Sequence, residues 1–165
     1  MRTGTYVALV FAAVVLDAAV APEIAILGAR PDFLVLVIVY AGLALGATPA
    51  VIGGFAAGLV ADSELPDYLG LHALSLSLTG YMTASLWDHL VKSNVLVQCA
   101  ILFGASLLHD TIYYVGYYRN HIDMFGPFFV RYALLGAAYT AALGALVYVV
   151  ARWRHWGAIV GDTRT

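Results

Sequence analysis

The sequence predicts an all-α integral membrane protein, a six-transmembrane-helix bundle formed by a single domain. Two observations predict this class: 62% of the 165 residues are hydrophobic, and the charged residues, 11% of the chain, lie between long apolar segments. A membrane-spanning helix needs about 20 mostly apolar residues, so six spans with short loops use nearly the whole chain. The expected domain covers residues 1–165, with 157–165 as a flexible cytoplasmic tail.

Proline, glycine and charged residues divide the apolar sequence into spans. The first span ends before Pro22, and the second begins after Pro31, a residue that suits a first helical turn because no N–H is needed there. A tight turn is expected at Gly46-Ala47-Thr48-Pro49. The predicted spans are Thr5–Val20, Phe33–Leu45, Ala50–Ala61, Leu71–Leu90, Val95–Tyr118 and Phe128–Val150.

The third predicted span is short for a bilayer crossing. About 12 residues extend about 18 Å at 1.5 Å per residue, against a hydrocarbon core of about 30 Å. We therefore expect the acidic loop after it to enter the outer leaflet, with Leu65, Tyr68 and Leu69 packed against neighbouring helices.

Basic residues favour an orientation with both termini in the cytoplasm, because cytoplasmic loops carry an excess of lysine and arginine. The inner side would hold Arg2, Lys92, Arg152, Arg154 and Arg164, and the outer side Arg30, Arg119 and Arg131. Aromatic residues at the interfaces agree with this orientation. Trp87, Trp153 and Trp156 would mark the inner interface, and the tyrosines of 113–118 the outer one.

In this orientation the ionisable residues gather near the outer ends of the spans. A charged group at membrane depth costs about 2.5–3.5 kcal/mol, so it is usually paired or faces a cavity. We expect two groups of side chains. One is an intramembrane polar network of Asp17, His109, Asp110 and Arg131. The other, here called the outer face, is a candidate partner face or polar pocket made of Pro31, Asp32, Asp62, Gly70, Leu71 and His72.

Three interpretations of these polar residues remain open. They form a structural network in which Arg131 neutralises carboxylates, a pocket that opens outward for a ligand or partner, or a metal or catalytic site. No metal, nucleophile or phosphate-loop motif is present, so the prediction is no enzyme, no cofactor and no metal. The net charge of −2 gives no basic face for nucleic acid.

Small residues at four-residue spacing predict close helix packing, because lipid provides no hydrophobic force between helices. The clearest seam is Gly54-xxx-Gly58 in the third span. Such a seam either holds the bundle together or receives a helix of a partner. Similar spacing occurs at Gly42 and Gly46, at Ala100 and Gly104, and at Gly136, Thr140 and Gly144.

Three stretches together resemble the bacterial rod-shape-determining MreD family. They are Arg30–Val37, with Pro31-Asp32 opening the second span; Gly53–Asp62, a glycine-rich helix ending in Asp; and Leu69–Tyr81, which begins Leu-Gly-Leu-His-Ala-Leu. The order and spacing of these motifs carry the resemblance over residues 30–81. The acidic link between Asp62 and Gly70 is slightly longer than is typical of the family, and Asp17 replaces an uncharged polar residue.

The resemblance implies a fold similar to the substrate-binding subunits of energy-coupling-factor transporters, in the bacterial inner membrane. It implies a non-enzymatic scaffold of the cell-elongation complex that binds the single-span protein MreC and helps to regulate peptidoglycan synthesis and rod shape. RodA, a class B penicillin-binding protein and MreB would belong to the same complex. The alternative is a substrate-binding subunit of an energy-coupling-factor vitamin transporter, for which Ala8-xxx-Ala12 would provide the docking face.

Overall fold

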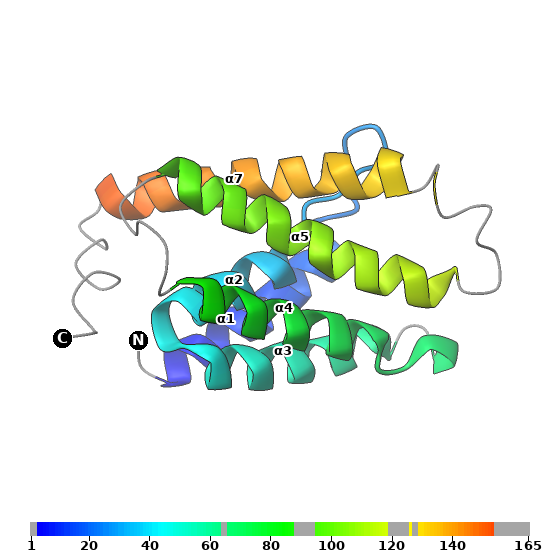
Figure 1. Cartoon of the computed structure of the whole chain (residues 1–165), viewed down its shortest axis with the longest axis horizontal. Helices are drawn as coiled ribbons and strands as arrows, with labels where there is room; N and C mark the ends of the chain where they lie inside the picture. Colours follow the sequence, from blue (N-terminus) through cyan, green and yellow to red (C-terminus); the bar gives the residue numbers. More distant parts are fainter. Residues whose placement is uncertain (1–2, 64–65, 88–94, 119–125, 127–128, 154–165) are drawn as a thin grey trace.

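A computed structural model describes residues 3–63, 66–87, 95–118, 126 and 129–153 of the chain. These residues form six α-helices, a short 3₁₀ turn (η1) and a π-helical turn (η2), shown in Figure 1. The α-helices are α1 (Thr3–Ala19), α2 (Phe33–Leu45), α3 (Ala47–Asp62), α4 (Leu71–Trp87), α5 (Val95–Tyr117) and α7 (Leu134–Trp153). The turns are η1 (Pro66–Tyr68) and η2 (Phe129–Ala133), and η2 leads directly into α7.

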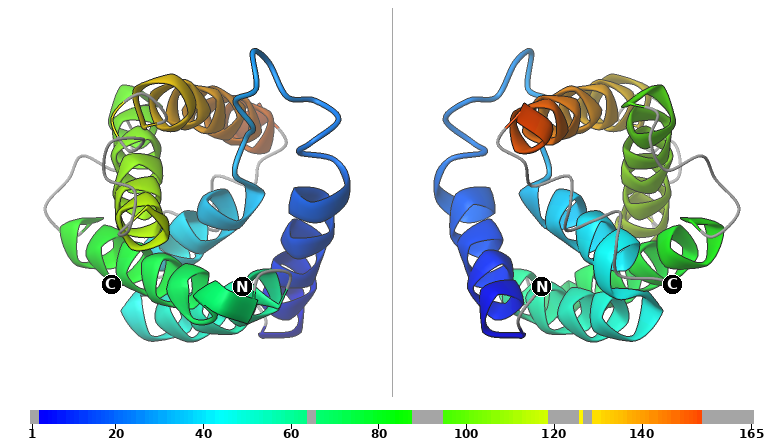
Figure 2. Two further views of the ribbon diagram at one scale, coloured as in Figure 1. Left: turned by 90° about the vertical axis from the view of Figure 1, so that its right-hand side faces the viewer. Right: turned by 90° about the vertical axis from the view of Figure 1, so that its left-hand side faces the viewer.

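The helices run roughly along one axis, so the bundle has two ends. We call the end at which α1 begins and α7 ends the terminal end, and the opposite end, where α1 ends and α2 begins, the cavity end (Figure 1). The end-on views in Figure 2 show α2 in the middle, with the other five helices around it. A helix that is apolar on all sides is suited to this place, and the buried residues of α2 are Leu34, Val35, Leu36, Ile38, Val39, Ala41, Gly42 and Leu43.

The second span has the predicted bounds, and the third begins earlier than predicted. The turn expected at Gly46-Ala47-Thr48-Pro49 is wrong: Gly46, with a φ of 91°, is the single residue between α2 and α3. Pro49 lies in the first turn of α3, where helical N–H groups have no intrahelical partner and a missing one costs nothing. The 16 residues of α3 extend about 24 Å, which reduces the expected mismatch with the bilayer.

The glycine seam of α3 is occupied by α4. A Cβ added at Gly58 would overlap the backbone of Ala73, and one at Gly54 would lie 2.9 Å from the carbonyl carbon of Leu76. These two helices therefore approach backbone to backbone, which is what small residues permit. In contrast, Gly104 on α5 is exposed and a Cβ there would meet nothing within 4 Å.

Two tyrosines join helices that are distant in sequence. The Tyr6 hydroxyl donates to the carbonyl of Pro49 at 2.9 Å, which ties α1 to α3. The Tyr40 hydroxyl donates to the carbonyl of Gly144 at 2.8 Å, which ties α2 to α7. Each bond satisfies a phenol inside the bundle, where an unpaired hydroxyl is costly.

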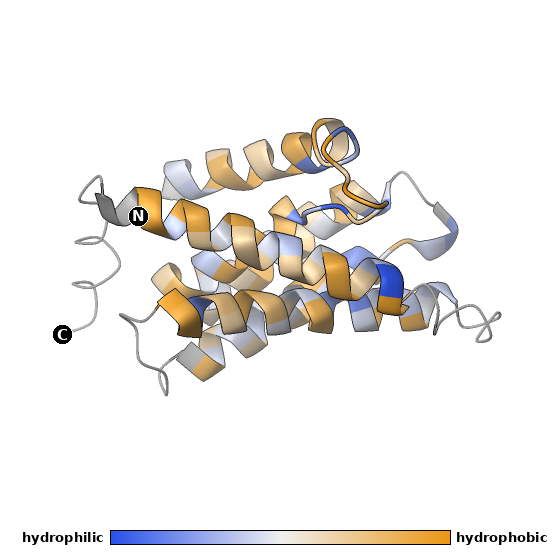
Figure 3. Ribbon diagram, turned by 90° about the horizontal axis from the view of Figure 1, so that it is seen from above, coloured by the Kyte–Doolittle hydropathy of each residue, from blue (hydrophilic) through white to orange (hydrophobic). Residues whose placement is uncertain are grey.

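The outside of the bundle is strongly apolar. Figure 3 shows hydrophobic residues along the helices, with most of the strongly hydrophilic colour toward the cavity end. Exposed examples are Phe11 at 70% and Leu146 at 59%. By length and composition, two of the described helical segments, Val95–Tyr117 and Phe129–Val150, are long and apolar enough to cross a membrane. Three apolar segments are shorter: Gly4–Ala19, Phe33–Leu45 and Ala47–Asp62.

Several predicted features fall outside the described residues. These include the end of the fourth span at residues 88–90, Leu65, the tail at 157–165, and the side chains of most residues used to orient the chain. Of the acidic link, Tyr68 packs against Tyr117 of α5 with ring centroids 4.6 Å apart, as expected. The expectation for Leu69 is wrong, because 66% of this residue is exposed.

Candidate functional site: a polar cavity at one end of the bundle

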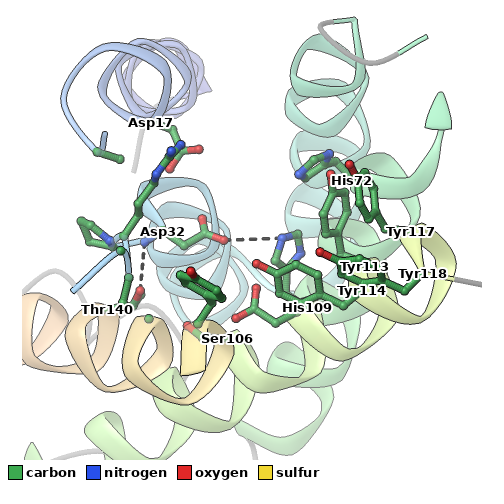
Figure 4. Close-up of a pocket in the computed structure, with 18 residues that line it drawn as sticks. Asp17, Asp32, His72, Ser106, His109, Tyr113, Tyr114, Tyr117, Tyr118 and Thr140 are labelled. Carbon is green, nitrogen blue, oxygen red and sulfur yellow. Dashed lines mark hydrogen bonds and ion pairs between the residues drawn. The ribbon is translucent and has the colours of Figure 1, made fainter. Parts of the chain in front are cut away.

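A cavity of about 460 Å³ opens at the cavity end of the bundle. Figure 4 shows the side chains that line it, which come from α1, the loop after it, and α2, α4, α5, η2 and α7. The volume lies in the range of small-molecule sites, about 300–1,000 Å³. Its polar and aromatic lining residues are Asp17, Arg30, Asp32, His72, Ser106, His109, Asp110, Tyr113, Tyr114, Tyr117, Tyr118, Tyr132 and Thr140.

The loop between α1 and α2 contributes one side of the cavity. A tight turn at residues 26–29 is closed by two backbone hydrogen bonds of 2.9 Å between Ile26 and Ala29. Leu27 and Gly28 both have positive φ, at 54° and 86°, and Leu27 is 73% exposed. A Cβ at Gly28 would lie 2.8 Å from the ring of Tyr132, so the turn rests on that ring. The chain then continues through the buried Pro31 to Asp32.

Asp32 anchors the start of α2. Its Oδ1 accepts the N–H of Val35 at 2.7 Å, which caps the helix as the Pro-Asp motif predicts. The N–H of Asp32 donates to Thr140 Oγ1 of α7 at 2.9 Å, and the next N–H, of Phe33, donates to Asp17 Oδ1 of α1 at 3.1 Å. The second carboxylate oxygen, Oδ2, faces His109 Nε2 of α5 at 3.5 Å. Asp32 thus links α2 to α5 and α7, and the neighbouring N–H of Phe33 links it to α1.

Asp62 anchors the start of α4 in a similar way. Although it ends α3 and is only 1% exposed, its two oxygens accept the N–H groups of Gly70, His72 and Ala73 at 2.9, 3.0 and 3.2 Å. Its Oδ1 also lies 3.0 Å from His72 Nδ1. A carboxylate there satisfies otherwise unpaired amides and favours the positive end of the helix dipole. Gly70 has a φ of 97°, a backbone conformation that residues other than glycine rarely adopt.

The second half of α5 supplies the aromatic and imidazole groups. Tyr113 lies against His72, with ring centroids 4.1 Å apart, and stacks on Tyr117 at 5.8 Å. Deeper along α5, Ser106 and His109 are 2% and 4% exposed, and within the described residues Ser106 Oγ and His109 Nδ1 have no hydrogen-bond partner.

Comparisons with known proteins support the family resemblance that the sequence motifs indicate. The family model of the rod shape-determining protein MreD matches residues 2–153, which is nearly the whole chain. This chain belongs to the MreD family. No curated protein and no solved structure matches it.

Membership of the MreD family establishes the coarse function. The protein is a membrane protein with a role in determining rod shape, and the family is a structural one that is not known for catalysis. The match extends the resemblance well beyond residues 30–81, on which the motifs lie. It gives no support to the alternative of a vitamin-transporter subunit.

In this MreD-family chain, most of the predicted polar residues lie together. Asp17, His109 and Asp110 of the intramembrane network line one cavity, which Asp32 and His72 of the outer face also line. Arg131 is not among the lining residues; it is exposed, with its guanidinium carbon 5.7 Å from the ring centroid of Tyr132. Among the described residues no ion pair links Arg131 to a carboxylate.

The other residues of the outer face do not line the cavity, except Pro31, and most of them are buried or packed beside it. Asp62 and Pro31 are buried, Gly70 is partly buried, and Leu71 packs where α5 has Gly116. Sequence reasoning did not assign Arg30, Thr140 or Tyr132 to the site. Thr140 could have been predicted, because a polar residue among the small residues of a helix-packing seam needs a hydrogen-bond partner on another helix.

Proposed function

We propose that this protein is a non-enzymatic scaffold of the bacterial cell-elongation complex, and that its outer face binds MreC and thereby helps to regulate peptidoglycan synthesis. RodA, a class B penicillin-binding protein and MreB act in the same complex. The observation that carries the proposal is the family match over residues 2–153. The fixed geometry of the outer face supports its finer part, because a preorganised surface loses little entropy when it binds.

The proposed arrangement is one domain that crosses the inner membrane six times, with both termini in the cytoplasm and the cavity opening outward. A bundle of six α-helices with a polar cavity at one end supports a fold like that of the energy-coupling-factor subunits. The start of α1 and the end of α7 lie at the same end of the bundle, as an even number of crossings requires (Figure 1). Residues 157–165 would then be a cytoplasmic tail.

A pair of reporter fusions tests this topology. Green fluorescent protein fused after Arg164 should fluoresce, and alkaline phosphatase fused there should be inactive, because the former folds in the cytoplasm and the latter needs the periplasm. The matched fusions after Asn120, between α5 and α7, should give the opposite pattern. Active phosphatase after Arg164 would contradict the proposed orientation and place the cavity on the cytoplasmic side.

The outer face is proposed as the MreC contact because its exposed parts are held rigidly by its buried parts. Asp62 fixes the backbone of Gly70 and His72, and Asp32 fixes the start of α2. The His72 side chain remains 24% exposed, as does that of Asp32. A single-span partner with a periplasmic domain would approach the bundle from this end.

Replacing His72 with alanine should reduce the recovery of MreC with the purified protein by about five- to tenfold, the effect of one important interface residue. The measurement is co-isolation from membranes that contain both proteins, normalised to the amount of the His72→Ala variant and accompanied by its Tm. Asp32→Ala should act in the same direction.

The matched control is Leu86→Ala, which changes an exposed residue near the other end of the same helix. Its MreC recovery should equal that of the wild type. Undiminished recovery with both His72→Ala and Asp32→Ala would exclude the outer face as the contact. A parallel fall of protein amount, Tm and recovery would show that these side chains only stabilise the bundle.

A further inference from the structure

Three potential metal ligands from two helices converge deep in the polar cavity. Asp32 comes from the start of α2, and His109 and Asp110 come from consecutive positions of α5; one ligand atom from each lies within 4.8 Å of the others. Figure 4 shows Asp32 and His109 facing each other across the cavity. Asp32 is far from the other two residues in the sequence, so no short motif marks the group. The three come together only because the fold places the start of α2 beside α5.

The spacing between Asp32 and His109 suits a shared cation better than a direct hydrogen bond. Their Oδ2 and Nε2 atoms are 3.5 Å apart, whereas an N–H···O hydrogen bond is usually about 2.7–3.2 Å. Ligand atoms at about 2.0–2.2 Å from a tetrahedral metal ion lie about 3.4 Å from one another. The observed separation is close to that value, and a carboxylate oxygen of Asp110 lies within 4.8 Å of both atoms.

The three side chains also have binding capacity that the described residues do not use. Asp32 uses Oδ1 to cap α2, which leaves Oδ2 for the cavity. The imidazole of His109 is 4% exposed; its Nε2 faces Asp32 Oδ2, and its Nδ1 has no hydrogen-bond partner among the described residues. Within the same part of the chain no hydrogen bond to the Asp110 carboxylate is found. A carboxylate at membrane depth requires a counter-charge, and these two lie side by side.

We infer that Asp32, His109 and Asp110 bind a divalent metal cation, with Zn²⁺ or Mn²⁺ as the best match. One imidazole and two carboxylates suit these ions better than Ca²⁺ or Mg²⁺, which prefer oxygen ligands alone. The cavity of about 460 Å³ leaves room for water molecules to complete the coordination. The cation neutralises the paired carboxylates and joins the start of α2 to α5. This inference does not rest on the proposed contact with MreC.

Metal content and thermal stability of the purified full-length chain test the inference. The affinity tag is removed, metal is stripped with EDTA, and the protein in detergent is titrated with ZnCl₂ or MnCl₂ before desalting and elemental analysis. We expect one equivalent of metal per chain and a rise in Tm of roughly 5 °C at saturation. Asp110→Asn and His109→Gln should each weaken binding at least tenfold, since even loss of an outer-shell partner costs about 10–100-fold.

Two controls distinguish this site from adventitious binding. Asp67→Asn removes an exposed carboxylate of η1 and should keep one equivalent. A variant with His89, His121 and His155 all changed to Gln should also keep it. Metal-free Asp110→Asn should be at least as stable as the metal-free wild type, because one of two neighbouring carboxylates has been neutralised. Absence of stoichiometric metal, or equal binding by Asp110→Asn and His109→Gln, would overturn the inference.

Discussion

Replacing Gly58 with leucine is expected to remove most of the folded protein from the membrane. Even a single Cβ at this position would overlap the backbone of Ala73 on α4, and a backbone cannot move aside as a side chain can. Overpacking typically costs about 1–3 kcal/mol, and the rigid α3–α4 contact places this substitution at or above the upper end. The measurements are the amount of protein in the membrane fraction and the Tm of what can be purified.

The matched control is the same substitution at Gly104, on α5. A Cβ there meets nothing within 4 Å, and the residue is exposed. We expect Gly104→Leu to change the free energy of unfolding by no more than about 0.5 kcal/mol. If Gly58→Leu accumulates and melts like the wild type, α3 and α4 do not pack as described. If the two variants behave alike, helix propensity rather than packing decides the outcome.

Replacing Asp62 with alanine is expected to have the second large effect. It leaves the N–H groups of Gly70, His72 and Ala73 without their acceptor and removes the partner of the His72 ring. Loss of a cap costs about 0.5–2 kcal/mol, and each buried unsatisfied donor about 1–3 kcal/mol. Because relaxation and water recover part of this, we expect a loss of about 2–4 kcal/mol in the free energy of unfolding, measured by thermal or denaturant unfolding in detergent.

Hydrogen exchange locates the effect within the chain. In Asp62→Ala the amides at the start of α4 should exchange faster, while those in the middle of α5 keep their protection. Asp62→Asn, which keeps one acceptor oxygen, should lose about half as much stability. The control Asp67→Ala changes an exposed residue and should be neutral. Wild-type stability of Asp62→Ala would show that water can replace the carboxylate and that α4 needs no cap from α3.

Much of the helix pattern was predictable, because the signals that set it are local. The bounds of α2 follow from the Asp32 cap and from Gly46. The start of α3 did not follow, because Pro49 is typical both of a turn and of a first helical turn, and sequence alone does not separate the two. The π-helical turn η2 before α7 has no local sequence signal, because its five residues contain neither proline nor glycine.

The candidate site was predictable in its composition but not in its pairing. Asp17, His109 and Asp110 were expected to avoid lipid because a charged group at membrane depth is costly, and in the structure they line one cavity. The sequence favoured Arg131 as the neutralising partner because it is the complementary charge at similar depth, yet it lies outside the cavity. Pairing depends on how far each helix is rotated, and a helix that is apolar on most sides gives no periodicity from which to read its rotation.

The dependence of α4 on Asp62 has a consequence for how the protein is made. During synthesis α3 leaves the ribosome before the residues that complete its contacts: its glycine seam faces α4, and the carboxylate at its end binds amides at residues 70, 72 and 73. Until those residues emerge, α3 lacks the helix that covers its glycine-rich face, and the carboxylate of Asp62 lacks its hydrogen-bond donors. We therefore expect the two helices to enter the membrane together, as a hairpin. On this expectation, slower translation between residues 62 and 87 would lengthen the time for which α3 lacks its partner.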